Sequence, residues 1–295
     1  MRFKVPELTK YICLRTIQYL ATIFSGVTAT FFLVKAMPVN AVEAMLANIM
    51  RAGQIIDPAG LIILRRTFYE LFGIGESPLE TYFLFLKRVF TFDFGPSIIS
   101  YPTPASDLIF AKLPWTIGLL SVSTLISGVI GNILGIMAAY FRHKRFSKVL
   151  ESIAITLYPI PYYILALVLV TSFAYIIRIF PPGGGISIIS EQLTLEVILN
   201  IIWHSILPAL SIIIPGAFGW AFLSSRALSI QVMVEDYVEF AELRGVPKKQ
   251  ILNRYLLRNI LPPQMTNFAL SLGGIFNGAL LTEIIFSYPG VGTLL

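Results

Sequence analysis

Residues Leu113–Phe141 read LPWTIGLLSVSTLISGVIGNILGIMAAYF, a run of 29 residues without a charged side chain. An α-helix needs about 20 apolar residues to cross the roughly 30 Å hydrocarbon core of a bilayer. Four further charge-free runs are long enough to cross: Thr16–Val34, Ser152–Ile177, Val197–Ser225 and Asn259–Thr282. The alternating segments of about ten residues that mark a membrane β-barrel are not seen. The pattern predicts an all-α membrane protein with five spans.

The composition agrees with a membrane protein. Of the 295 residues, 56% are hydrophobic and 13% are charged, and the mean hydropathy is +0.78. A soluble domain carries about 25% charged residues. The chain is therefore neither a disordered protein, nor a nucleic-acid-binding module, nor an ordinary water-soluble enzyme. The single cysteine, Cys13, excludes a disulfide framework and a cysteine-based metal cluster.

The basic residues predict an orientation, because short cytoplasmic loops of membrane proteins are enriched in Lys and Arg. The turn between the second and third spans is strongly basic, whereas the next turn has Arg178 at its edge beside Glu191 and Glu196. We therefore place Phe141–Glu151 in the cytoplasm and Ile179–Glu196 outside. The basic N-terminal tail and the basic segment Arg226–Arg258 agree with this orientation, so we expect a multi-pass protein of the cell membrane with both of these segments in the cytoplasm. The net charge of +6 then reflects topology and not a nucleic-acid partner.

The chain divides into three predicted regions. Residues 1–35 form a cytoplasmic N-terminus and the first span, with a cleaved signal peptide as the alternative to an uncleaved anchor. Residues 36–112 form an external segment of short helices, which either lie over the membrane and the bundle or receive an external partner. Asp57-Pro58 and the capping box Ser77-Pro78-Leu79-Glu80 begin two of these helices, and a short amphipathic stretch follows at Ser106–Lys112. Residues 113–295 form the core, with a cytoplasmic loop at 226–260.

Within that loop, residues 235–258 have the pattern of a helix, a tight turn and a second helix. Acidic residues cluster at the start of the first helix and Arg244 lies in its last turn, as the helix dipole favours. Gly245 occupies the position after the helix that prefers a left-handed backbone, and Pro247 opens the second helix. We call residues 235–258 the elbow. A protruding, bent pair of helices of this kind suits docking into a groove on another protein.

The elbow also carries a family resemblance. Glu239-Phe240-Ala241-x-x-x-Gly245, followed by Leu261-Pro262, resembles the cytoplasmic EAA loop of ABC-importer permeases. Asp236-Tyr237-Val238-x-x-Ala241-x-x-x-Gly245 is similar to the version in dipeptide and oligopeptide permeases. Matching pieces occur in order along nearly the whole chain: Tyr11-x-x-x-Arg15, Phe92-Asp93-Phe94-Gly95-Pro96-Ser97, His204-x-x-x-Pro208 and Phe286-Ser287-Tyr288-Pro289-Gly290-Val291-Gly292.

The resemblance implies the membrane domain of a type I ABC importer, with a sixth span expected after Leu295. A second homologous permease, two cytoplasmic ATPase subunits and an external solute-binding protein would be its partners in the lipid bilayer. The chain itself would be no enzyme, with no cofactor, metal or catalytic residue, since ATP binds to the partner subunits. It contains no G-x-x-x-x-G-K-[ST] phosphate loop. The resemblance assigns ATPase coupling to Asp236, Glu239, Phe240, Ala241, Gly245 and Val246.

Two departures from the family pattern stand out. Met37-Pro38-Val39-Asn40 replaces the usual Pro-Gly-Asp-Pro after the first span, and Phe240 replaces a small residue in the EAA triplet. We expect the second departure to reshape the docking surface of the elbow.

The spans contain a few informative residues. Gly131-x-x-x-Gly135 and Gly274-x-x-x-Gly278 predict close helix packing. Pro159, Pro161, Pro208 and Pro215 bend or interrupt the third and fourth spans, and irregular backbone at membrane depth tends to line a cavity. Four polar residues at depth either face the pathway or bridge helices: Asn132, Asn267, Ser271 and Asn277.

Three features nearer the span ends have structural interpretations. We interpret Gly183-Gly184-Gly185 as an external turn and His204 as a structural residue near the outer interface. Glu283, at the outer end of the fifth span, either snorkels towards the interface or caps a turn, or it takes part in gating.

Other functions remain open at the level of sequence. Peptides are the expected substrates, with oligosaccharides or nickel complexes as alternatives within the same importer type. A secondary transporter or channel would normally show intramembrane charges and repeated halves. An intramembrane hydrolase is disfavoured, because the two histidines, His143 and His204, lie far apart in sequence and no aspartate lies in a span.

Overall fold

The computed structural model describes residues 5–36, 41–51, 57–72, 77–97, 100–186 and 194–294, without the side chains of residues 5–7, 41, 44, 48, 51, 58 and 274–279. The predicted all-α class is confirmed, since the described residues form helices and one isolated bridge between Pro96 and Pro104. The chain divides into two compact units, residues 1–108 and 109–295. The predicted core boundary at 112/113 and this division both fall inside one helix, α5 (Ala105–Tyr140).

The first unit contains α1 (Val5–Ala36), α2 (Ala41–Arg51), α3 (Pro58–Leu71) and α4 (Pro78–Thr91). Its core lies between α2 and α3, where Val42, Met45, Leu46 and Phe68 are buried together. Helix α1 contacts α4 through the hydroxyls of Thr28 and Tyr82, 2.8 Å apart. Only 6% of the most apolar part of α1 is buried, as expected of a helix whose side chains face lipid.

The predicted helix starts in this unit are confirmed. Helix α4 begins at Pro78, and the Ser77 hydroxyl accepts a hydrogen bond from the backbone N–H of Glu80 at 3.1 Å. Helix α3 begins at Pro58 after Asp57, although the Asp57 side chain makes no capping hydrogen bond. The amphipathic stretch Ser106–Lys112 forms the first turns of α5, which continues through Pro114 into the second predicted span.

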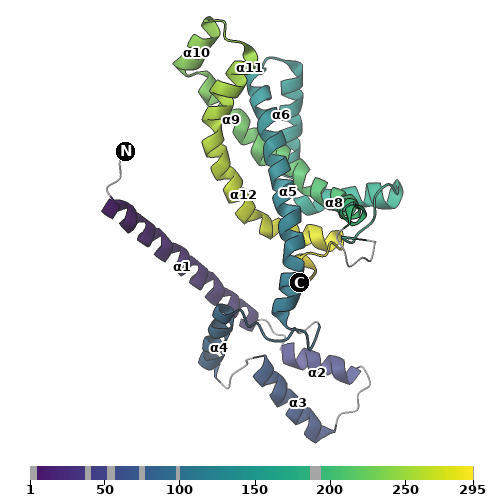
Figure 1. Cartoon of the computed structure of the whole chain (residues 1–295). Coiled ribbons are helices and arrows are strands. Elements are labelled where there is room, and N and C mark those ends of the chain that lie inside the picture. Colours follow the sequence, from purple (N-terminus) through teal and green to yellow (C-terminus); the bar gives the residue numbers. More distant parts are fainter. Residues whose placement is uncertain are drawn as a thin grey trace. The chain divides into compact units, whose positions relative to one another are not determined.

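The second unit is a helical bundle with its elbow at one end (Figure 1). It consists of α5 with α6 (Arg145–Leu157), α7 (Tyr162–Leu169), η1 (Val170–Ile176), α8 (Leu195–Gly216), η2 (Ala217–Ala221), α9 (Phe222–Met233), α10 (Asp236–Leu243), α11 (Lys248–Gln250), η3 (Ile251–Leu257), α12 (Arg258–Ile285) and η4 (Val291–Leu294). The segments η1, η2 and η3 are π-helical and η4 is a 3₁₀ turn. Helix α12 packs against α7, α8 and α9, and α6 packs against η2.

Three helical segments are long and apolar enough to cross a membrane: Leu8–Ala36, Ala105–Tyr140 and Leu195–Met233. A fourth crossing results if α6 and α7–η1, which are bent by 101° at residues 158–161, count as one broken span. The fifth predicted span lies in α12, a helix of 28 residues whose side chains at 274–279 are outside the described set. The count of five spans therefore stays a prediction.

The predicted effects of proline and glycine are confirmed in part. Pro159 and Pro161 lie at the 101° bend, whereas Pro208 and Pro215 lie inside the continuous helix α8, which passes into the π-helical η2. A Cβ on Gly131 would lie 2.4 Å from the carbonyl oxygen of Ala217, so α5 needs glycine there for its close approach to η2. Gly274 and Gly278 are among the residues whose side-chain environment is not described.

Candidate functional site

The turn of the elbow has the geometry that its sequence predicts. Gly245 has φ +75°, and its N–H donates to the carbonyl of Glu242 at 2.9 Å. The N–H of Val246 donates to the carbonyl of Ala241 at 3.1 Å. These two bonds form a Schellman motif, which satisfies the last carbonyls of a helix and requires a left-handed residue. Lys248, directly after Pro247, begins the second helix, which continues through η3 into α12.

The elbow has an inner and an outer face. Val238 and Ala241 are buried, and Val238 packs against Ile251, Leu256 and Ile260 in one apolar cluster. Phe240 is 56% exposed and Leu243 is 80% exposed, so the outer face presents large apolar side chains to solvent. Asp236, Glu239 and Gly245 are exposed as well, whereas Val246 is half-buried. An exposed apolar patch rimmed by charges is typical of a protein–protein contact surface.

Basic residues gather around the same end of the second unit. The turn between α5 and α6, with exposed Arg142, Lys144 and Arg145, lies at the end of the bundle that carries α10 and α11 (Figure 1). The Arg244 guanidinium lies 4.5 Å from the centre of the Phe240 ring, a cation–π contact on the outer face.

Burial and the neighbouring Glu235 carboxylate raise the pKa of the Tyr237 hydroxyl, so this side chain stays neutral at physiological pH.

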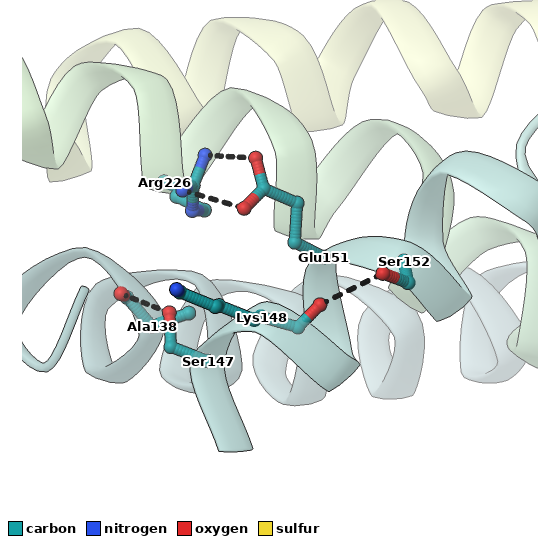
Figure 2. A network of polar contacts seen from close by, with 6 residues as sticks. All are labelled: Ala138, Ser147, Lys148, Glu151, Ser152 and Arg226. Atoms are coloured by element: carbon teal, nitrogen blue, oxygen red, sulfur yellow. Dashed lines mark hydrogen bonds and ion pairs between the residues drawn. The ribbon is translucent and has the colours of Figure 1, made fainter. Parts of the chain in front are cut away.

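An ion pair joins the helix that leads into the elbow to α6. The Arg226 guanidinium on α9 binds the Glu151 carboxylate on α6 through two contacts of 2.8 and 2.9 Å (Figure 2). The side chains are 20% and 33% exposed, so the pair is partly shielded from solvent. The buried Ser147 hydroxyl, one turn away, donates to the carbonyl of Ala138 on α5 at 2.7 Å. Helix α6 is thereby fixed to both α5 and α9.

Three adjoining cavities surround Trp220 on η2, and we call them together the hollow. Their volumes are about 250, 570 and 270 Å³, and Trp220 lines all three. The other lining residues are Thr124, Ser127, Tyr158, Pro159, Ile160, Pro161, Tyr162, Ile212, Pro215, Gly216, Leu223, Ser224, Asn267, Leu270 and Ser271. The bend between α6 and α7 thus forms one wall of the hollow. The position of the bend beside a cavity agrees with the prediction that irregular backbone in a span lines a cavity.

At the opposite end of the bundle, residues 183–185 meet residues 283–292, and we call this the glycine-rich end. The N–H of Gly184, whose φ is +89°, donates to the carbonyl of Phe286 at 2.9 Å. The fully buried Glu283 accepts a hydrogen bond from the N–H of Gly292 at 2.7 Å. A Cβ on Gly290 would lie 2.2 Å from the Glu283 carboxyl carbon. Glu283 therefore caps the turn that follows α12, which is one of the roles expected for it.

Comparison with known proteins places the bundle in a family. Residues 131–295, more than half of the chain, match the family described as binding-protein-dependent transport system inner membrane component. This chain belongs to that family. It is an all-α, multi-pass membrane permease with the type I ABC importer fold, as the motifs of the elbow predict.

Similar permeases cover nearly the whole chain. The oligopeptide transport system permease protein AppB of Bacillus subtilis is 29% identical over 96% of this chain and 85% of its own length. The dipeptide transport system permease protein DppB of the same organism is 27% identical over 97% of this chain and 84% of its own length. The oligopeptide transport system permease protein OppB of Salmonella typhimurium is 24% identical over 97% of this chain and 85% of its own length.

The structure separates the predicted pathway residues of this permease. Asn267 and Ser271 on α12 line the hollow. The Asn132 side chain instead donates to the carbonyl of Gly128 on its own helix at 2.7 Å and lines none of the three cavities. Asn277 lies outside the described side chains. His204 bonds the carbonyl of Asn200 at 2.9 Å, consistent with its structural interpretation.

Sequence reasoning missed Trp220, Thr124 and the Glu151–Arg226 pair. Trp220 lies in Gly216-Ala217-Phe218-Gly219-Trp220, directly after Pro215. A proline and two closely spaced glycines before a tryptophan could have indicated that the helix is irregular there and that the tryptophan lines a cavity. The ion pair joins residues 75 positions apart, and no local pattern signals that pairing.

Proposed function

We propose that this permease forms half of the membrane pathway of an ATP-driven, binding-protein-dependent importer of peptides. A second homologous permease completes the pathway, an external binding protein delivers the solute, and two cytoplasmic ATPase subunits bind the elbow. The permease itself hydrolyses no ATP. Family membership supports this arrangement, and the similarity to oligopeptide and dipeptide permeases supports peptides as the solute.

The elbow is the single observation that supports ATPase coupling. Its turn has one defined shape, because the Schellman hydrogen bonds and left-handed Gly245 fix the angle between its helices. Its outer face combines exposed Phe240 and Leu243 with the carboxylates of Asp236 and Glu239. These two carboxylates make no hydrogen bond or ion pair within the described ranges. They are free to bind basic groups of a partner that seats the apolar side chains in a groove.

The distribution of charge supports the orientation that we propose. The elbow and the basic turn between α5 and α6 share one end of the bundle (Figure 1). Basic residues in short loops favour the cytoplasmic side. The elbow and the N-terminus would then face the cytoplasm, where ATPase subunits reside, and the glycine-rich end would face outside.

Substitution of Gly245 by Val tests the coupling. A β-carbon in the left-handed region costs roughly 1–2 kcal/mol, so the turn of the elbow is strained or shifts. A Cβ at Gly245 meets nothing within 4 Å, so no packing clash is expected. In the complex with the partner permease, ATPases and binding protein, we expect peptide uptake and substrate-stimulated ATPase activity to fall about tenfold. The permease itself should remain in the membrane.

Gly184→Val is the matched control. Gly184 also has a positive φ and also has open space around its Cβ position, but it lies at the glycine-rich end. Similar backbone strain there should leave ATPase stimulation within about twofold of the unmodified complex. Equal activity losses in both variants, or unchanged ATPase stimulation in Gly245→Val, would rule out the elbow as the coupling element.

A further inference from the structure

We infer that the hollow around Trp220 is a solute-contact site that binds an uncharged segment of a peptide in transit, such as its backbone amides and small side chains. The inference deepens the proposed function, since it assumes a peptide importer and names the residues that touch the solute. It rests on the shape of the hollow, on an unpaired buried hydroxyl and on the absence of charge in its described walls.

The size of the hollow suits a short peptide segment. Its three cavities share the Trp220 side chain, and the first and second also share Ser271. Ligand sites in proteins typically have volumes of about 300–1,000 Å³ and combine apolar walls with a few polar groups. The largest of the three cavities alone, about 570 Å³, falls in this range.

Thr124 provides the most specific indication of a ligand. It is 1% exposed, it lines the hollow, and its Oγ1 makes no hydrogen bond within the described part of the chain. Its neighbour Ser127 differs, because its hydroxyl donates to the carbonyl of Ser123 at 2.7 Å. A buried hydroxyl without a partner is destabilising, so such groups normally receive one. A carbonyl or N–H of a passing peptide supplies that partner.

The aromatic wall provides a second kind of contact. Trp220 lies in the π-helical segment η2, and π-helical turns are frequent at functional sites. Tyr158 and Tyr162 flank the 101° bend and line the hollow beside Trp220. Flat aromatic faces accept planar amides and small apolar side chains without regard to sequence, which suits a channel that must pass many peptides.

The charge of the walls limits what binds there. The described residues that line the three cavities include hydroxyl, amide, aromatic and aliphatic side chains but no charged one. Transfer of an unpaired charge into such surroundings is costly. The hollow therefore contacts the neutral middle of a peptide, whereas the charged termini lie elsewhere.

Uptake by the reconstituted complex, with radiolabelled tri-alanine as the probe, tests this site. We expect Thr124→Val, which keeps the shape of the side chain but removes its hydroxyl, to reduce uptake about tenfold. Trp220→Ala should reduce it at least as much. Trp203→Ala is the control, because Trp203 packs on Phe180 outside the hollow and its loss should leave uptake within about twofold. Trp203→Ala should also leave basal ATPase activity unchanged, because neither the hollow nor the elbow is altered.

A photo-crosslinking measurement gives a readout other than activity. A tripeptide with a central benzoylphenylalanine should label residues of the hollow, and tri-alanine should protect against labelling. Labelling elsewhere, or normal uptake in both Thr124→Val and Trp220→Ala, would overturn the inference. Protection by maltotriose but not by tri-alanine would overturn the assignment to peptides.

The two proposals fail in different ways. If no ATPase copurifies with the permease, the proposed function fails, while crosslinking to the solubilised permease still tests the hollow. If ATPase coupling is normal but the hollow is not labelled, only the inference drawn from the hollow fails.

Discussion

Each end of the bundle contains a turn with a glycine of positive φ, but the residues around the two glycines differ. Each contains a left-handed glycine in open space, Gly245 in the elbow and Gly184 at the glycine-rich end. In the elbow, the residues around the glycine expose Phe240 and Leu243 to solvent. At the glycine-rich end, the chain instead folds over the fully buried carboxylate of Glu283.

This difference indicates that the two ends have different tasks. At the glycine-rich end, the buried Glu283 carboxylate binds the N–H of Gly292 through one oxygen, while its other oxygen makes no hydrogen bond within the described residues. This end is nevertheless closed over by its own chain, and Glu283 is not exposed. The elbow leaves apolar and acidic side chains at its surface, where only a partner can cover them. We therefore expect substitutions at the glycine-rich end to act mainly on stability, and substitutions at the elbow to act mainly on coupling.

Gly290→Ala should have the largest effect on stability. Its Cβ would lie 2.2 Å from the Glu283 carboxyl carbon, and Glu283 has no open space to enter because it is buried. Overpacking of this kind costs about 1–3 kcal/mol and occasionally more, and we expect a value at the upper end. Thermal unfolding in detergent, followed by intrinsic fluorescence, measures the loss.

The double variant Glu283→Ala with Gly290→Ala tests the cause of that loss. Removal of the carboxylate makes room for the new methyl group, so the two substitutions should be less destabilising together than their sum. Strict additivity would show that the Gly290 effect has another origin.

Arg226→Ala should have the second largest effect. Breaking a fully buried ion pair costs about 3–5 kcal/mol, and an exposed pair contributes about 0–1 kcal/mol. With side chains 20% and 33% exposed, we expect a loss of about 1–3 kcal/mol, again measured by thermal unfolding. Because the pair joins α9, which leads into the elbow, to α6, which ends at the hollow, peptide uptake should fall as well.

The exchange of both charges, Glu151→Arg with Arg226→Glu, is the matched test of the pair. It preserves one basic and one acidic group at the same two positions, so it should restore a large part of the stability and the uptake. If the exchanged variant behaves no better than Arg226→Ala, the two helices are not coupled through this pair.

Phe240→Ala should have the smallest effect on stability and a clear effect on coupling. The side chain is 56% exposed, and exposed substitutions usually change the free energy of unfolding by less than about 0.5 kcal/mol. An aromatic anchor at the centre of an interface often contributes more than 1 kcal/mol to binding, so the affinity for the ATPase should fall about tenfold. Phe90→Ala on α4 is the control, since Phe90 is similarly exposed, at 66%, outside the elbow. Equal ATPase affinities for both variants would argue against a docking surface at Phe240.

The parts of the fold that the sequence predicted correctly depend on local chemistry. Gly245 and the capping box at Ser77 act within a few residues of themselves, so their identity alone indicates the turn or the helix start. The close approach at Gly131 was also predictable, because a residue without a side chain at this spacing has few other uses in a span.

The parts that were not predicted depend on contacts between distant segments. Asn132 has the same polarity as Asn267, but it bonds its own helix while Asn267 lines the hollow, and only the packing of α5 and α12 decides between the two. Thr124 lies in a span with several other hydroxyl residues, and nothing near it in sequence indicates that its hydroxyl lines the hollow without a partner. Prolines at 159 and 161 predicted a bend but not its angle.

The 101° bend has a consequence for the lipid bilayer itself. With a rise of about 1.5 Å per residue, α6 is about 20 Å long, and neither it nor α7 with η1 can cross a hydrocarbon core of about 30 Å alone. The peptide groups near Tyr158–Pro161 then lie at a depth where hydrocarbon offers them no hydrogen bonds. The N–H groups of Tyr158 and Ile160 bond to carbonyls within the chain. Because the cavities around Trp220 border the bend, we expect water in the hollow to hydrate the backbone groups that the bend leaves without a helical partner.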